Sequence, residues 1–73
     1  MDEIIRILND YNKGVDFGVE KKIMTDGILD SVEMVELISS LENIFDVEIP
    51  LDMIMPENFD SVELIWQNIS KLM

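Results

Sequence analysis

The sequence contains neither cysteine nor histidine. Without cysteine there are no disulfides and no thiolate metal ligands. Without histidine there is no imidazole ligand and no histidine general base. Ser-His and Cys-His nucleophile pairs are excluded for the same reason. We therefore expect no catalytic residues, no metal site and no enzymatic activity of the chain's own.

Basic residues are also scarce. The chain has five Lys and Arg against sixteen Asp and Glu, a formal net charge of −11, and no basic side chain from Ile23 to Ser70. Nucleic acid and anionic membrane surfaces repel such a protein, whereas a partner protein with a basic patch attracts it. The alternative, that the acidic residues only keep a small protein soluble, stays open for any single residue.

Long apolar runs are missing as well. The start, Met1-Asp2-Glu3, lacks the positive region and apolar run of a signal peptide, and no run is long enough to cross a bilayer. We expect a cytoplasmic protein without stable membrane insertion. The 73 residues and 48% apolar content predict one folded domain, residues 1–73.

Apolar residues recur at helical spacing in three segments of the chain. These segments are Asp2 to about Asn12, Ser31 to Phe45, and Ser61 to about Leu72. Pro56 to Phe59 can form a single helical turn with proline at its start. The pattern predicts an all-α fold, a small bundle of three main helices plus one short helix, without a sheet.

Two connecting segments show no sustained periodicity. Residues 14–29 are interpreted as a long ordered loop, in which Phe17, Ile23 and Ile28 contribute to the core. Residues 47–50 are predicted to be extended, because a proline ends them and biases the preceding residue away from helix.

The pair Asp30-Ser31 opens the longest predicted helix. An anion attached to a hydroxyl there is stabilised by the unpaired N–H groups and the positive end of the helix dipole. The plain alternative is that both residues only cap the helix. Asp60-Ser61 opens the last helix in nearly the same sequence context, and local chemistry does not choose between the two serines.

A wider context separates them. The segments Asp26-Gly27-Ile28-Leu29-Asp30-Ser31-Val32-Glu33-Met34-Val35-Glu36-Leu37 and Leu41-Glu42-Asn43-Ile44-Phe45-Asp46-Val47-Glu48-Ile49-Pro50 strongly resemble the acyl carrier protein family. The resemblance implies that Ser31 carries 4′-phosphopantetheine, transferred from coenzyme A by a phosphopantetheinyl transferase. It implies further that Asp30 is the helix cap beside the group, that Ser61 is only a cap, and that the fold is acyl-carrier-like.

The cargo is less sharply defined by the resemblance. Fatty-acid carriers usually have Gly-Ala-Asp-Ser-Leu, whereas this chain has Gly-Ile-Leu-Asp-Ser-Val, residues 27–32, which is more similar to stand-alone carriers of specialised pathways. The main interpretation is a discrete carrier of acyl thioesters for a fatty acid, polyketide or specialised pathway. A D-alanyl, aminoacyl or peptidyl carrier is the alternative, and an unmodified acidic helical interaction module is the second.

A docking face is expected beside Ser31. Partner enzymes that activate or transfer the acyl or aminoacyl group would bring basic surfaces to a monomeric carrier. The residues proposed to meet them are Val32, Glu33, Val35, Glu36 and Glu42. If the cargo is a fatty acyl chain, it would enter between helices, among residues that are sufficiently explained as core: Met34, Leu37, Ile38, Leu41, Ile54 and Ile65.

Overall fold

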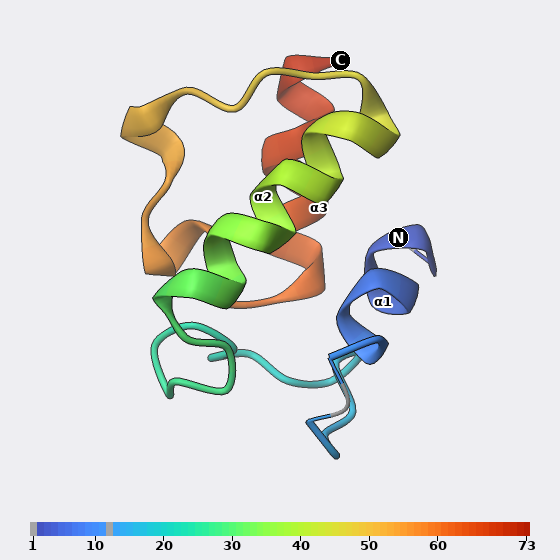
Figure 1. Cartoon of the computed structure of the whole chain (residues 1–73), viewed down its shortest axis with the longest axis vertical. Helices are drawn as coiled ribbons and strands as arrows, with labels where there is room; N and C mark the ends of the chain where they lie inside the picture. Colours follow the sequence, from blue (N-terminus) through green and yellow to red (C-terminus); the bar gives the residue numbers. More distant parts are fainter. Residues whose placement is uncertain (1, 12) are drawn as a thin grey trace.

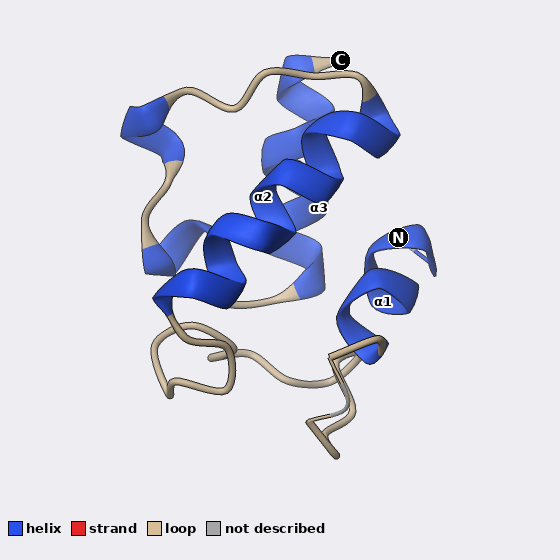
Figure 2. Ribbon diagram, in the orientation of Figure 1, coloured by secondary structure: helices blue, strands red, loops and turns tan. Residues whose placement is uncertain are grey.

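Three α-helices and two short 3₁₀ helices make up the fold, seen in a computed structural model that describes residues 2–11 and 13–73 (Figure 1). The α-helices are α1 (Asp2–Asn9), α2 (Ser31–Phe45) and α3 (Val62–Leu72). The 3₁₀ helices, η1 (Leu51–Met53) and η2 (Pro56–Asn58), lie between α2 and α3. No strand occurs in the described residues (Figure 2), and the prediction of an all-α fold is confirmed.

Helix α1 is amphipathic and shorter than predicted. Ile4 and Leu8, one turn apart, are fully buried. The prediction that this helix continues to about Asn12 is wrong, since it ends at Asn9, and Asn12 itself lies outside the described residues. The N–H groups of Asp10 and Tyr11 bond to carbonyls three residues back, which tightens the last turn and ends the helix.

Helix α2 has the predicted bounds. Its buried stripe consists of Leu37, Ile38 and Leu41. The helix ends at Asp46, whose left-handed backbone (φ 53°) turns its N–H back to the Glu42 carbonyl. The stripe faces the core and leaves the opposite side of α2 exposed.

Helix α3 contributes a third buried stripe, made of Val62, Ile65 and Ile69. It begins one residue later than predicted, because Ser61 is its N-cap. Helix α1 contacts both α2 and α3. The end of α2 also meets α3 through the rings of Phe45 and Trp66, whose centroids are 5.9 Å apart.

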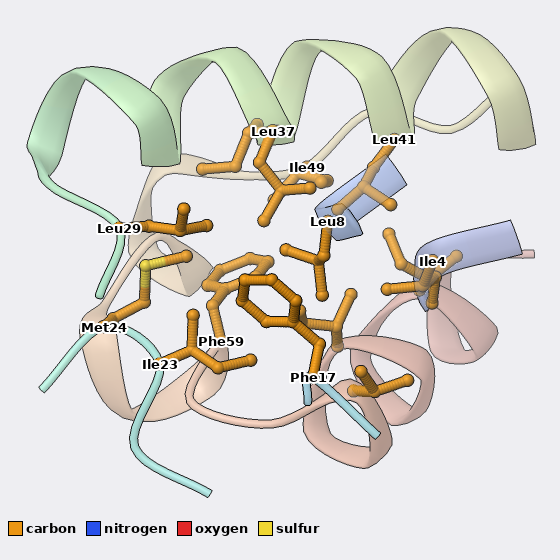
Figure 3. Close-up of a cluster of buried hydrophobic side chains, with 14 residues drawn as sticks. Ile4, Leu8, Phe17, Ile23, Met24, Leu29, Leu37, Leu41, Ile49 and Phe59 are labelled. Atoms are coloured by element: carbon orange, nitrogen blue, oxygen red, sulfur yellow. The ribbon is translucent and has the colours of Figure 1, made fainter. Parts of the chain in front are cut away.

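The segments between helices complete the core (Figure 3). The predictions for Phe17 and Ile23 are confirmed, since each is at most 1% exposed. Ile28 is only half-buried, and its neighbour Leu29 is buried instead. The sequence did not predict η1, a single turn after Pro50, or the buried positions of four further residues outside the helices: Met24, Leu29, Ile49 and Phe59.

None of the helices described is long and apolar enough to span a membrane.

Candidate functional site

The start of α2 is capped by Asp30 and Glu33. The Asp30 Oδ1 atom accepts the Glu33 N–H at 2.8 Å, and the Glu33 Oε1 atom accepts the Asp30 N–H at 3.1 Å. This reciprocal arrangement is a capping box. Asp30 therefore caps the helix, and the cap does not require the hydroxyl of Ser31.

Ser31 is the first residue of α2 and its side chain is exposed. At this position the hydroxyl stands beside the backbone N–H groups of the first helical turn, where the helix dipole is positive. An anion bonded to this oxygen is stabilised by both features. The hydroxyl is thus accessible from solvent and placed where a phosphate group would be favoured.

The second Asp-Ser pair is used differently. Ser61 is only 4% exposed, and its Oγ atom accepts the Leu64 N–H at 3.1 Å. Ser61 itself is the N-cap of α3, whereas in the first pair the aspartate has that role. The second serine is thus a buried cap, whereas the first one is accessible.

Asp60 is also buried, with 9% of its surface exposed. Its carboxylate accepts three hydrogen bonds from two residues of the loop before α2, Met24 and Thr25. Burial alone raises the pKa of this carboxyl, but these hydrogen bonds and the charge of Lys22 outweigh it and hold the pKa below its ordinary value. Apart from the repeat of the Asp-Ser pair, no sequence signal predicted this role.

The predicted docking residues divide into two groups. Val32 and Val35 are 68% and 60% exposed, and Glu36 is exposed on the same side of the helix. The other two glutamates form hydrogen bonds within the protein. Glu33 belongs to the capping box, and Glu42 accepts the Ile49 N–H through Oε2 at 2.8 Å.

A further contact ties the segment after α1 to the start of α2. The Lys13 Nζ atom lies 2.8 Å from the Glu33 Oε2 atom, and the Tyr11 hydroxyl donates to the Glu33 carbonyl oxygen at 3.3 Å. Burial, followed by the charges of Glu36 and Glu33, raises the pKa of Tyr11. Sequence reasoning missed this contact, because it depends on the path of the intervening loop.

Three of the residues between which a fatty acyl chain would enter are core residues. Leu37, Leu41 and Ile65 are fully buried within the continuous core. A small open cavity of about 150 Å³ lies elsewhere, lined by Ile7, Asp10, Tyr11 and Ser40. No cluster of three or more acidic side chains able to hold a metal ion is found among residues 2–11 and 13–73.

Ser31 thus begins the longest helix of an acidic chain of 73 residues and is exposed there. Comparison with curated proteins identifies the family. The chain is 32% identical over 53 residues to the D-alanyl carrier protein of Streptococcus uberis, a match that covers 73% of this chain and 67% of the relative. It is 28% identical over 71 residues to the D-alanyl carrier protein of Streptococcus mutans, covering 96% and 90%. The chain belongs to this family of acyl-carrier-like proteins, which are carriers and not enzymes.

No family model and no solved structure matches the chain.

Proposed function

We propose that residues 1–73 form a single carrier domain that holds a small aminoacyl cargo, D-alanine in particular, as a thioester on 4′-phosphopantetheine bonded to Ser31. The accessibility of the Ser31 hydroxyl at the first position of α2, while Asp30 alone caps the helix, carries this proposal. The relatives named as D-alanyl carrier proteins support the cargo.

The chain itself contributes anchoring and presentation. The phosphodiester would sit against the N–H groups and positive dipole at the start of α2. Because the chain has no cysteine, the reactive thiol comes from the arm, which supplies the thioester chemistry. Asp30 and Glu33 hold the first turn of the helix, so the point of attachment stays fixed while the arm moves.

A small polar cargo suits this protein better than a fatty acyl chain. All three relatives found are D-alanyl carriers, which favours the aminoacyl alternative over a role in fatty acid biosynthesis. The close packing of Leu37, Leu41 and Ile65 agrees with this choice, because D-alanine needs no apolar tunnel.

The partners we propose are a phosphopantetheinyl transferase, an adenylating ligase that loads the cargo, and an enzyme that accepts it. Their basic surfaces would meet Val32, Val35 and Glu36, the exposed members of the predicted docking face. Glu33 and Glu42 would contribute charge only, because their side chains bond within the protein. The carrier would act as a monomer in the cytoplasm, where coenzyme A and ATP are available.

Intact-mass measurement tests the attachment. After incubation with coenzyme A and a phosphopantetheinyl transferase, the wild-type chain should gain the mass of one phosphopantetheine group, and Ser31→Ala should gain none. Ser61→Ala is the matched control. It should still be modified, although loss of its cap lowers the free energy of unfolding by about 1 kcal/mol in urea titrations.

Cargo is tested next on the modified protein. A D-alanine-activating ligase with ATP should add one D-alanyl group, and the adduct should be released by hydroxylamine as expected for a thioester. An unmodified wild-type mass, or modification that persists in Ser31→Ala, would overturn the attachment and favour an unmodified interaction module. Loading by a fatty acyl ligase but not with D-alanine would overturn the cargo alone.

A further inference from the structure

Asp60 binds the loop before α2 through four hydrogen bonds. Its Oδ1 atom accepts the N–H groups of Met24 at 2.9 Å and Thr25 at 2.8 Å, and its Oδ2 atom accepts the Thr25 hydroxyl at 2.6 Å. Its carbonyl oxygen accepts the Ile23 N–H at 2.9 Å. Three consecutive loop residues are therefore held by one residue at the start of α3.

The buried carboxylate is not needed to begin α3. Ser61 supplies the cap of that helix, and the carboxylate of Asp60 is directed to the loop instead. A buried carboxylate is unfavourable unless hydrogen bonds compensate for its lost hydration. Here the compensation comes entirely from Met24, Thr25 and the nearby charge of Lys22, so Asp60 and the loop stabilise each other.

The held loop leads directly to Ser31. Within it, the Leu29 N–H bonds to the Ile23 carbonyl at 3.2 Å, and the Gly27 N–H bonds to the Met24 carbonyl at 3.1 Å. The Leu29 side chain is 2% exposed and anchors the same end of the loop in the core. Figure 1 shows the loop folding back below the start of α2. Hydrogen bonds thus connect Asp60 to Ile23 and Ile23 to Leu29, the residue that precedes the Asp30 cap.

A second contact joins the same loop to α3. The Lys21 Nζ atom lies 2.9 Å from the Glu63 Oε2 atom, but the two side chains are 63% and 45% exposed. Exposed ion pairs contribute little to stability. The buried bonds of Asp60 are therefore the main polar attachment of the loop.

We propose that Asp60 is a positioning residue, which holds the junction of this loop with α2 in the single form that enzymes acting at Ser31 recognise. This inference rests on the proposed function. It assigns the second Asp-Ser pair a role in presenting the first one, at a distance of about thirty residues in the sequence.

Three variants test the proposal. Asp60→Ala removes all three side-chain bonds. Asp60→Asn has the same net charge as Asp60→Ala but keeps an oxygen for both N–H groups, and its NH₂ group can donate to the Thr25 hydroxyl. Thr25→Val removes only the hydroxyl bond and alters an exposed residue, so it should fold. A truncation in the core at the far end of α3, Ile69→Val or Ile69→Ala, is chosen to match the melting temperature of Asp60→Ala.

The first readout is amide hydrogen exchange, which does not depend on the proposed function. In Asp60→Ala the amides of Met24, Thr25 and Leu29 should exchange faster than in the matched Ile69 variant, and Asp60→Asn should restore most of the protection. Thr25→Val should fall between wild type and Asp60→Ala. If Asp60→Ala does not fold, the amide exchange rates of Thr25→Val are compared with those of wild type and Asp60→Asn instead. Faster loop exchange in Thr25→Val than in wild type then supports the proposal, and equal rates overturn it.

The second readout is steady-state modification of Ser31 at a temperature where every variant is folded. Asp60→Ala should raise the KM of the phosphopantetheinyl transferase about tenfold with little change in kcat, the factor expected if the recognised junction is populated one-tenth of the time. The KM for Asp60→Asn should return close to the wild-type value, and the KM for the Ile69 variant should equal that of wild type. Equal KM values for Asp60→Ala and the Ile69 variant, or unchanged loop exchange, would overturn the positioning role. Absence of modification in wild type would overturn the proposed function instead.

Discussion

At the residue scale, the two Asp-Ser pairs show that identical neighbours do not share a role. Asp30 caps α2 and leaves the Ser31 hydroxyl exposed, whereas Ser61 caps α3 and frees Asp60 to bind a loop. Either residue of such a pair is a competent cap, because both offer an oxygen to the first-turn N–H groups. Local sequence therefore leaves the choice open, the family resemblance implies Asp30 and Ser61 as the caps, and the structure has both residues in that role.

The lowered pKa of Asp60 predicts a dependence of stability on pH. A carboxyl with a lower pKa in the folded than in the unfolded chain stabilises the fold above its ordinary pKa, and this contribution disappears as the pH falls through the folded value. Wild type should therefore exceed Asp60→Asn in free energy of unfolding at about pH 6, and the difference should shrink below about pH 4. Urea titrations of both proteins measure it. A difference that is constant or grows on acidification would contradict the assignment.

At the scale of elements, the helices and the loops were predictable to different degrees. The apolar period of 3.6 residues defined α2 completely and predicted the existence of α1 and α3. Residues 14–29 have no period, yet Phe17, Ile23 and Leu29 enter the core from them. Their inward orientation is set by tertiary contacts such as the Asp60 bonds, which no local pattern encodes.

This loop should therefore be as important to stability as a helix. Phe17 is 1% exposed and Val19, two residues further, is 68% exposed. Phe17→Ala should lower the free energy of unfolding by about 3 kcal/mol or more through lost burial and a cavity. Val19→Ala, the control in the same loop, should change it by less than about 0.5 kcal/mol. Equal effects of the two substitutions in urea titrations would show that the loop is not part of the core.

At the scale of the whole molecule, the main feature is the excess of acidic over basic residues. Sixteen acidic residues oppose five basic ones, and three of the basic residues pair with nearby glutamates: Arg6 with Glu3, Lys13 with Glu33, and Lys21 with Glu63. The molecule measures 30 × 22 × 19 Å. The screening length is about 30 Å at 0.01 M salt and about 10 Å at 0.1 M, so at low salt every carboxylate repels every other across the protein.

Salt should consequently stabilise the fold. The melting temperature should rise between about 0.01 M and 0.1 M sodium chloride, because repulsion between distant acids is screened while close ion pairs are affected less. A relief of about 1 kcal/mol would correspond to about 4–8 °C in a domain of this size. Differential scanning calorimetry measures the shift, and a melting temperature that stays flat or falls would show that self-repulsion is unimportant.

The sequence by itself determined the helical class, the acidic surface, the absence of Cys and His chemistry, and the family resemblance centred on Ser31. These follow from composition, from periodicity and from contiguous motifs, all of which are local. Only the tertiary structure decided which Asp-Ser pair stays exposed, which glutamates remain available for partners, and how the loop before Ser31 is held. The hold on the loop depends on contacts between residues more than thirty positions apart, such as Met24 and Asp60, and Glu42 is engaged by Ile49 of the segment after its helix. The period of a single segment carries no information about either contact.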